Sequence, residues 1–257
     1  MAERGLRKIL IVGGPRLSLT IAALTAHPVA AASPSIASRC QAAVEERLAD
    51  WGAGAERYRD IEGAFGAREW RIATETLGTW VLLHEPPDGA PSLVRVEESG
   101  TTRVSFDAGC DESSSFEPRP PAPELAFTDR DLRALVASAP RGVIFVWSPH
   151  MPLSVDAYRT VSEVARRMGL SFTALRDPMS DAAYAASVAQ EAGMPASALR
   201  PFASVELSLR QATLHAPALL VFAHGRFSGL AVPGYREAAG FEAAISERLR
   251  AAASPSR

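Results

Sequence analysis

Cysteine is scarce in this sequence, since Cys40 and Cys110 are the only two among 257 residues. The sequence also lacks a marked excess of either charge, because 27 basic and 29 acidic residues leave a net charge of -2. A nearly balanced chain without a long like-charged run has no basic surface for nucleic acid, so we expect no nucleic-acid partner. Both cysteines lie in the first half of the chain. Thiol–disulfide exchange by a cysteine pair in the second half is therefore excluded.

Long apolar runs are also missing. A membrane-spanning helix needs about 20 predominantly apolar residues, whereas the stretch Ile9–Ala26 is interrupted by glycines, a proline and Arg16. Its basic start and the small residues Ala30–Ala32 are typical of a cleaved signal peptide. We predict a signal peptide over residues 1–32, with an uncleaved anchor as the alternative. The expected location is the bacterial periplasm or the exterior, with no membrane span in the mature chain.

The two cysteines are expected to pair with each other in an oxidising compartment. A disulfide that closes a loop of about 70 residues stabilises a fold by roughly 4 kcal/mol in the chain-entropy model. Two unpaired cysteines are the alternative that the sequence leaves open.

The chain after residue 32 divides into two parts. Residues 33–112 predict a small α+β domain with a helix over 38–49 and no catalytic motif. Residues 113–126 are rich in serine and proline, which indicates an extended linker, and residues 127–257 form the second domain. The strands expected in the first domain are Trp70–Ala73, Gly78–His84, Leu93–Glu97 and Arg103–Asp107.

The second domain alternates strands and helices. Thr128 is suited to begin a helix, and the apolar run Val143–Trp147 predicts a strand buried on both faces. A strand, a helix and a second strand in succession indicate a parallel pair joined by a right-handed crossover. The later segments are a helix over Val155–Met168, a strand over Ser171–Leu175, a helix over Asp181–Ala192, a long connection over Met194–Thr213, a hairpin at His224–Gly225 and a helix over Arg236–Ala251.

Two motifs in this domain resemble the thioredoxin-like superfamily. The first is WSPHM at Trp147–Met151, between an apolar strand and a helix, and the second is HAPALLVFAHGR at His215–Arg226. The resemblance covers about residues 127–251 and implies an α/β, thioredoxin-like fold, with a central mixed sheet flanked by helices. It also implies that Pro217 is a cis-proline facing the WSPHM turn, with a trans proline at a strand start as the alternative. Ser148 and Met151 stand where the family carries its two cysteines, so the family's redox activity is not expected.

We therefore predict an exported, redox-inactive thioredoxin-like binding module with no catalytic residue, cofactor or metal. Active thioredoxins bind extended peptide beside the cis-proline, and the resemblance implies that recognition can outlast the loss of both sulfurs. The predicted partner is a peptide or protein segment. Its expected contacts are Trp147, Ser148, Pro149, His150, Met151, His215, Ala216 and Pro217.

Other interpretations stay open. His150 and Met151, with His215, are soft enough ligands for Cu(I), as in an envelope copper protein. Residual thiol–disulfide oxidoreductase activity would need Cys40 and Cys110 to be delivered to the turn, and Ser148 would need a base to act as a nucleophile. Alternatively, Trp147 and Met151 only pack beneath the helix.

Overall fold

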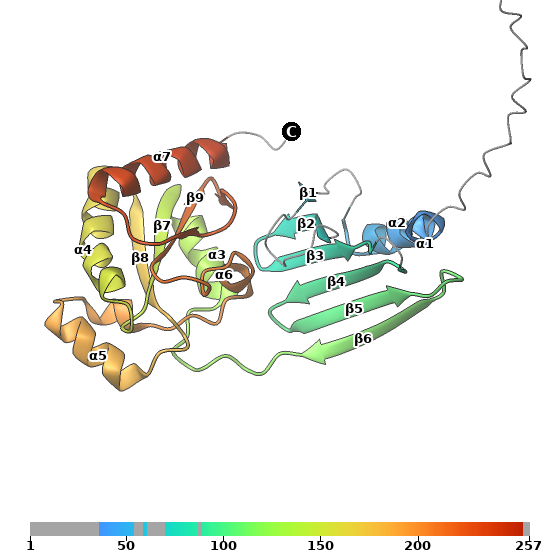
Figure 1. The fold of residues 1–257 in the computed structure, drawn as a ribbon, viewed down its shortest axis with the longest axis horizontal. Coiled ribbons are helices and arrows are strands. Elements are labelled where there is room, and N and C mark those ends of the chain that lie inside the picture. Colours follow the sequence, from blue (N-terminus) through green and yellow to red (C-terminus); the bar gives the residue numbers. More distant parts are fainter. Residues whose placement is uncertain (1–35, 54–58, 61–69, 87–88, 254–257) are drawn as a thin grey trace, which may run out of the picture. The chain divides into compact units, whose positions relative to one another are not determined.

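The computed structural model describes residues 36–53, 59–60, 70–86 and 89–253 (Figure 1). The predicted signal peptide lies outside these residues. The described residues belong to one compact unit, which contains two separate β-sheets. In the described part of the chain, no helix is long and apolar enough to cross a membrane.

The first sheet is an antiparallel meander of six strands in sequence order. Each strand expected from the sequence is present, and the structure adds β1 and β6. Strand β6 occupies the beginning of the segment predicted as a linker, and all its residues are exposed. A serine-rich edge strand exposed on both faces shows no apolar alternation, so the sequence pattern did not reveal it. The strands are β1 (Arg59–Asp60), β2 (Trp70–Thr76), β3 (Thr79–His84), β4 (Ser92–Glu97), β5 (Gly100–Phe106) and β6 (Glu112–Pro118).

Two short helices, α1 (Ile36–Arg39) and α2 (Gln41–Asp50), precede this sheet. Val44 and Leu48 of α2 lie in one apolar cluster with residues of strands β3 to β5. Alternation along the strands sends their other residues to the opposite face. The opposite cluster comprises Trp80, Leu82, Val94, Val96 and Val205.

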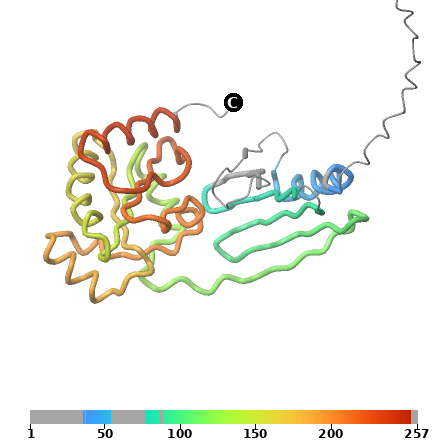
Figure 2. Tube along the Cα trace, viewed as in Figure 1, coloured from blue at the N-terminus to red at the C-terminus, as the bar shows by residue number. Residues whose placement is uncertain are grey.

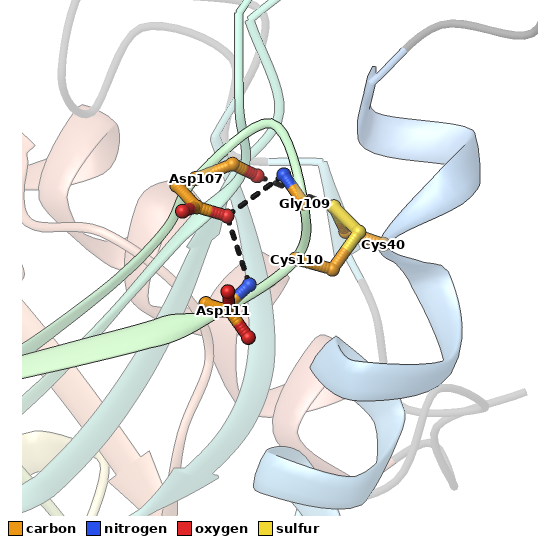
Figure 3. The surroundings of a disulfide bond; sticks show 5 residues. All are labelled: Cys40, Asp107, Gly109, Cys110 and Asp111. Atoms are coloured by element: carbon orange, nitrogen blue, oxygen red, sulfur yellow. Dashed lines mark hydrogen bonds between the residues drawn. A yellow bond between two sulfur atoms is a disulfide. The ribbon is translucent and has the colours of Figure 1, made fainter.

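A disulfide between Cys40 and Cys110 joins the start of α2 to the turn between β5 and β6 (Figure 3). The two Cα atoms are 5.2 Å apart and the cysteines are 70 residues apart in sequence. The Asp107 carboxylate organises the turn, because it accepts backbone hydrogen bonds from Gly109 at 2.8 Å and from Asp111 at 2.9 Å. The predicted pairing of the two cysteines is confirmed.

The second sheet has the strand order β10-β9-β7-β8, with β11 beside β9. Strands β7 and β8 are parallel, and β9 runs antiparallel to β7. Strand β9 is buried along its whole length and β7 is buried from Gly142 onward. The buried residues are apolar without interruption, as expected for strands covered on both faces. The strands are β7 (Arg141–Trp147), β8 (Ser171–Arg176), β9 (Ala218–Ala223), β10 (Arg226–Phe227) and β11 (Val232–Pro233).

Helices cover both faces of this sheet (Figures 1 and 2). Phe145 of β7 packs on the face covered by α4, α5 and α7, whereas Ile144 packs on the face covered by α3 and α6. The predicted α/β class, a mixed sheet flanked by helices, is confirmed. The helices are α3 (Asp129–Ser138), α4 (Pro152–Arg167), α5 (Ala182–Glu191), α6 (Val205–Leu209), α7 (Ala238–Ala253) and the 3-10 helix η2 (Ala196–Leu199).

The segment Met194–Thr213, expected as a connection without elements, contains both η2 and α6. These helices have four and five residues, too few to show a helical period in the sequence. Their packing against the rest of the chain stabilises them.

Candidate functional site

The WSPHM turn connects β7 to α4 and is held by hydrogen bonds. The Ser148 backbone N–H donates to Ser154 Oγ at 3.0 Å, and the Met151 N–H donates to the Ser148 carbonyl at 3.2 Å. Pro152 is the first residue of α4, where a proline loses no helical hydrogen bond. These hydrogen bonds hold the turn without a cysteine at Ser148 or Met151.

Trp147 lies beneath this turn. Its side chain is fully buried, and its indole N–H donates to the Ala198 carbonyl at 2.7 Å. The Trp147 carbonyl accepts from the Asp177 N–H at 2.8 Å, which ties the turn to the loop after β8. Of the predicted site residues, Trp147 therefore supports the surface from below, and Pro149 is buried as well.

The second motif meets the first across a small pocket. The Ala216–Pro217 peptide bond is cis, as the resemblance implied, and the Pro217 carbonyl accepts from the Gly234 N–H at 2.8 Å. A pocket of about 210 Å³ is lined by Ser148 and Met151 of the first motif and by His215 and Ala216 of the second. The remaining lining residues are Val146, Asp177, Ala212, Thr213 and Leu214.

Exposed apolar side chains occur on the segments that form this pocket. Met151 is 49% exposed and Leu214 is 60% exposed, and both line the pocket. Met179 is 87% exposed and lies in the loop after β8, two residues beyond the pocket residue Asp177, whose carboxylate accepts its N–H at 3.0 Å. His150 stacks on Tyr184 with ring centroids 5.1 Å apart.

Sequence reasoning missed Met179, Tyr184 and Leu214. One signal could have indicated Met179, because it follows the buried strand β8 as Met151 follows β7, and Trp147 is in register with Arg176 at the strand ends. Parallel strands end at the same edge of a sheet, where α/β proteins commonly bind ligands. No periodic signal marks Tyr184 or Leu214.

Arg176 positions the loop that carries Met179. Its guanidinium is buried and donates to the Leu199 carbonyl at 3.1 Å, to Ser180 Oγ at 3.1 Å and to the Ser180 carbonyl. These acceptors are uncharged, so the guanidinium acts here as a multidentate donor that fixes two loops.

The geometry offers little for catalysis at Ser148. The imidazole of His150 stacks on Tyr184, and no hydrogen bond joins Ser148 Oγ to His150 within the described residues. Cys40 is fully buried in its disulfide with Cys110. A hydroxyl without an adjacent base is a weak nucleophile, and a disulfide sulfur is not a thiolate.

A larger hollow of about 540 Å³ lies beside β8, lined by Leu125, Phe127, Leu175, Leu199, Arg200 and neighbouring residues. It contains none of the predicted site residues. Arg200, which lines it, pairs with Asp131 at 2.8 Å.

No protein-family model matches the chain, and no curated protein matches it. Two solved structures are similar. One is Mycobacterium tuberculosis DsbF in its mixed oxidized and reduced forms, with 12% identity and a TM-score of 0.33, covering 44% of this chain and 84% of that one. The other is a secreted M. tuberculosis disulfide oxidoreductase homologous to E. coli DsbE, with 13% identity and a TM-score of 0.31, covering 43% of this chain and 85% of that one.

Proposed function

We propose that this protein is an exported, redox-inactive thioredoxin-like module that binds an extended peptide segment at the pocket between the WSPHM turn and the Pro217 loop. The observation that carries the proposal is the arrangement of Met151, Leu214 and His215 around that pocket. Trp147 and Pro149 are buried in the turn, and Ser148 and Ala216 line the pocket.

The size of the pocket favours a side chain of a peptide over a whole small molecule. Pockets for drug-sized ligands measure about 300–1,000 Å³, whereas this one measures about 210 Å³. Flexible thioethers adapt to apolar surfaces of different shape, so Met151 and Met179 suit a partner with apolar side chains. The expected ligand is an extended, apolar segment with one side chain in the pocket.

Methionine methyl NMR tests this proposal with peptides selected from a phage-displayed random library. Met151 and Met179 are exposed, while Met168 and Met194 pack against the core. We expect selected peptides to shift the first two methyl signals and leave the other two unchanged. Peptides that bind without shifting Met151 would contradict the site.

A matched pair of variants sharpens the experiment. Leu214 and Leu125 are both strongly exposed leucines, at 60% and 77%, but only Leu214 lines the pocket. We expect Leu214→Ala to weaken peptide binding by roughly tenfold, about 1.4 kcal/mol, and Leu125→Ala to leave it unchanged. Equal effects of the two substitutions would show unspecific apolar adhesion.

The proposed location is the periplasm or the cell exterior. The disulfide between Cys40 and Cys110 supports it, because such bonds persist in oxidising compartments and are rare in the cytosol. We expect osmotic shock of the native bacterium to release a chain that lacks residues 1–32 and carries no free thiol. A full-length, reduced chain in the cytosolic fraction would overturn the localisation.

Cu(I) binding is a second candidate, since Met151 and His215 share the pocket and thioether and imidazole are ligands that Cu(I) accepts. Within the described residues, no group of three His, Cys, Asp or Glu side chains is placed to hold a metal. Native mass spectrometry after anaerobic addition of Cu(I) decides the question. A one-copper adduct that Met151→Ala and His215→Ala each abolish would establish the site, and a bare polypeptide would remove this candidate.

A further inference from the structure

Glu206 lies at the centre of a buried network that links the first sheet to the second domain. The side chain is fully buried. Its Oε2 accepts from the Trp80 indole N–H at 2.7 Å and from the Gly78 backbone N–H at 3.1 Å, both in or next to β3. Its Oε1 accepts from Arg210 Nε at 2.6 Å. One carboxylate therefore binds the β2–β3 hairpin and the end of α6 simultaneously.

Helix α6 is held from several directions. The buried Asp129 carboxylate of α3 accepts from the Val205 N–H at 3.0 Å, from the Glu206 N–H at 3.2 Å and from Ser204 Oγ. The Arg210 guanidinium lies over the rings of Trp80 and Phe227, 5.3 and 4.9 Å from their centroids. A helix of only five residues owes its position to these contacts.

The site loop follows α6 directly. The Ala212 N–H donates to the Leu207 carbonyl at 3.0 Å, and the Leu214 N–H donates to the Gln211 carbonyl at 3.2 Å. Residues 212–216 then line the pocket. Displacement of α6 would therefore move the segment that carries Leu214 and His215.

We propose that Glu206 is a latch, through which the β2–β3 hairpin of the first sheet holds the loop that leads from α6 to Pro217. The hairpin can approach so closely because residue 78 is glycine. Its φ is +84°, and a Cβ there would lie 2.8 Å from an Arg133 guanidinium nitrogen and 3.3 Å from Asp129 Cβ. Regulation of binding by the latch rests on the proposed function, whereas the latch itself does not.

The charges around Glu206 set the direction of the proton linkage. The pKa of Glu206 is raised to about 7, because burial and the nearby Asp129 carboxylate outweigh the hydrogen bonds from Trp80 and Gly78, which lower it. Arg210 Nε lies 2.6 Å from Glu206 Oε1 and favours the ionised form of Glu206. Arg133, near the hairpin, pairs with Glu98.

A raised pKa means that the folded state binds the proton more tightly than the unfolded state does. The stabilisation is therefore fully present below about pH 4.5 and is lost as the pH rises through about 7. The network contains two buried carboxylates, Asp129 and Glu206, and one buried guanidinium, Arg210. Ionisation of Glu206 as the pH rises therefore leaves one negative charge that Arg210 does not compensate.

Indole NMR tests the latch with an internal control. Trp80 and Trp147 are both fully buried and both donate at 2.7 Å, the first to the Glu206 carboxylate and the second to the Ala198 carbonyl. We expect the Trp80 indole signal to titrate with a midpoint of about 7 and the Trp147 signal to stay constant. A Trp80 signal that does not titrate, or that still titrates in Glu206→Gln, would overturn the proposal.

Amide exchange at Ala212 and Leu214 tests the connection to the site loop. After correction for hydroxide catalysis, we expect the opening constant to rise about tenfold from about pH 6 to about pH 8 in the wild type, and not in Glu206→Gln. Glu242→Gln, which changes an exposed glutamate paired with Arg167 at 2.9 Å, should behave as the wild type. An identical rise in Glu206→Gln would refute coupling between the latch and the loop.

Trp80→Phe is the second variant, in case Glu206→Gln does not fold. This variant removes the indole N–H donor and keeps the Glu206 carboxylate. We therefore expect the Ala212 amide to exchange faster than in the wild type even at low pH. Exchange at the wild-type rate would contradict the latch.

Binding of the selected peptides separates the two proposals. If the Trp80 signal titrates but no peptide shifts the Met151 methyl signal, the proposed function fails and the latch stands. If peptides bind with equal affinity at about pH 6 and about pH 8, the latch does not regulate binding.

Discussion

The two β-sheets of this chain are stabilised in different ways. The first is an antiparallel meander whose neighbouring strands follow each other in sequence, with an exposed edge strand and a disulfide to its helix. The second joins strands distant in sequence, has helices on both faces and contains no cysteine. A local meander with one modest cluster under α2 gains from a covalent link, whereas a sheet buried between two helical layers relies on packing.

The difference also concerns function. The first sheet carries no side chain of the pocket between the WSPHM turn and the Pro217 loop, yet its Trp80 contacts the helix that leads into that pocket. We infer that the first sheet is a support, and that the second sheet carries the binding surface. The following predictions test this division, from the largest expected effect to the smallest.

Phe145→Ala should cause the largest loss of stability. Phe145 is fully buried in the centre of β7 and lies against the rings of Tyr158 and Phe172. Truncation of a buried phenylalanine lowers the free energy of unfolding by about 3–5 kcal/mol. Urea unfolding followed at the indole signals of Trp80 and Trp147 measures each sheet separately. If the first sheet unfolds at a clearly higher urea concentration than the second, the two sheets are independently stable. That outcome would contradict the role of the first sheet as a support.

Replacement of both Cys40 and Cys110 by serine should have a smaller and more local effect. Loss of a disulfide that closes a long loop lowers the free energy of unfolding by about 2–4 kcal/mol. We expect the transition reported by Trp80 to shift more than that reported by Trp147. Peptide binding at the pocket should persist, and its loss would support the thiol-enzyme alternative instead.

Asp131→Ala should have the smallest effect, about 1 kcal/mol at neutral pH. The Asp131 carboxylate accepts the Thr128 N–H at 2.9 Å and pairs with Arg200 at 2.8 Å. Partial burial raises the pKa of Asp131, but the hydrogen bonds from Thr128 and Arg200 lower it more, so that it lies below 3.8. This stabilisation is present above about pH 4 and is lost as the pH falls through the lowered pKa. Unfolding curves of variant and wild type should therefore converge in acid, and a constant difference would exclude the ionised capping box.

Much of the second domain could be predicted because its signals are local. Thr128 and Asp131 form the capping box at the start of α3, and the apolar run at 143–147 is the buried part of β7. The cis bond at Pro217 followed from a resemblance between motifs, and its backbone isomer is confirmed. Helix α6 and strand β6 were missed, because five residues show no helical period and an exposed strand shows no alternation.

The site could be predicted only in outline. The sequence by itself determined that the WSPHM turn contains no cysteine and that two cysteines are available to pair. It also suggested, through the resemblance, that the turn and the proline loop lie together. These are properties of residue type and local order. The tertiary structure alone decided that Trp147 is buried under η2, that Met179 and Leu214 lie on the segments around the pocket, and that Glu206 accepts from Trp80, 126 residues earlier. Burial and long-range hydrogen bonds depend on which distant segments meet, and no periodicity along one segment encodes that meeting.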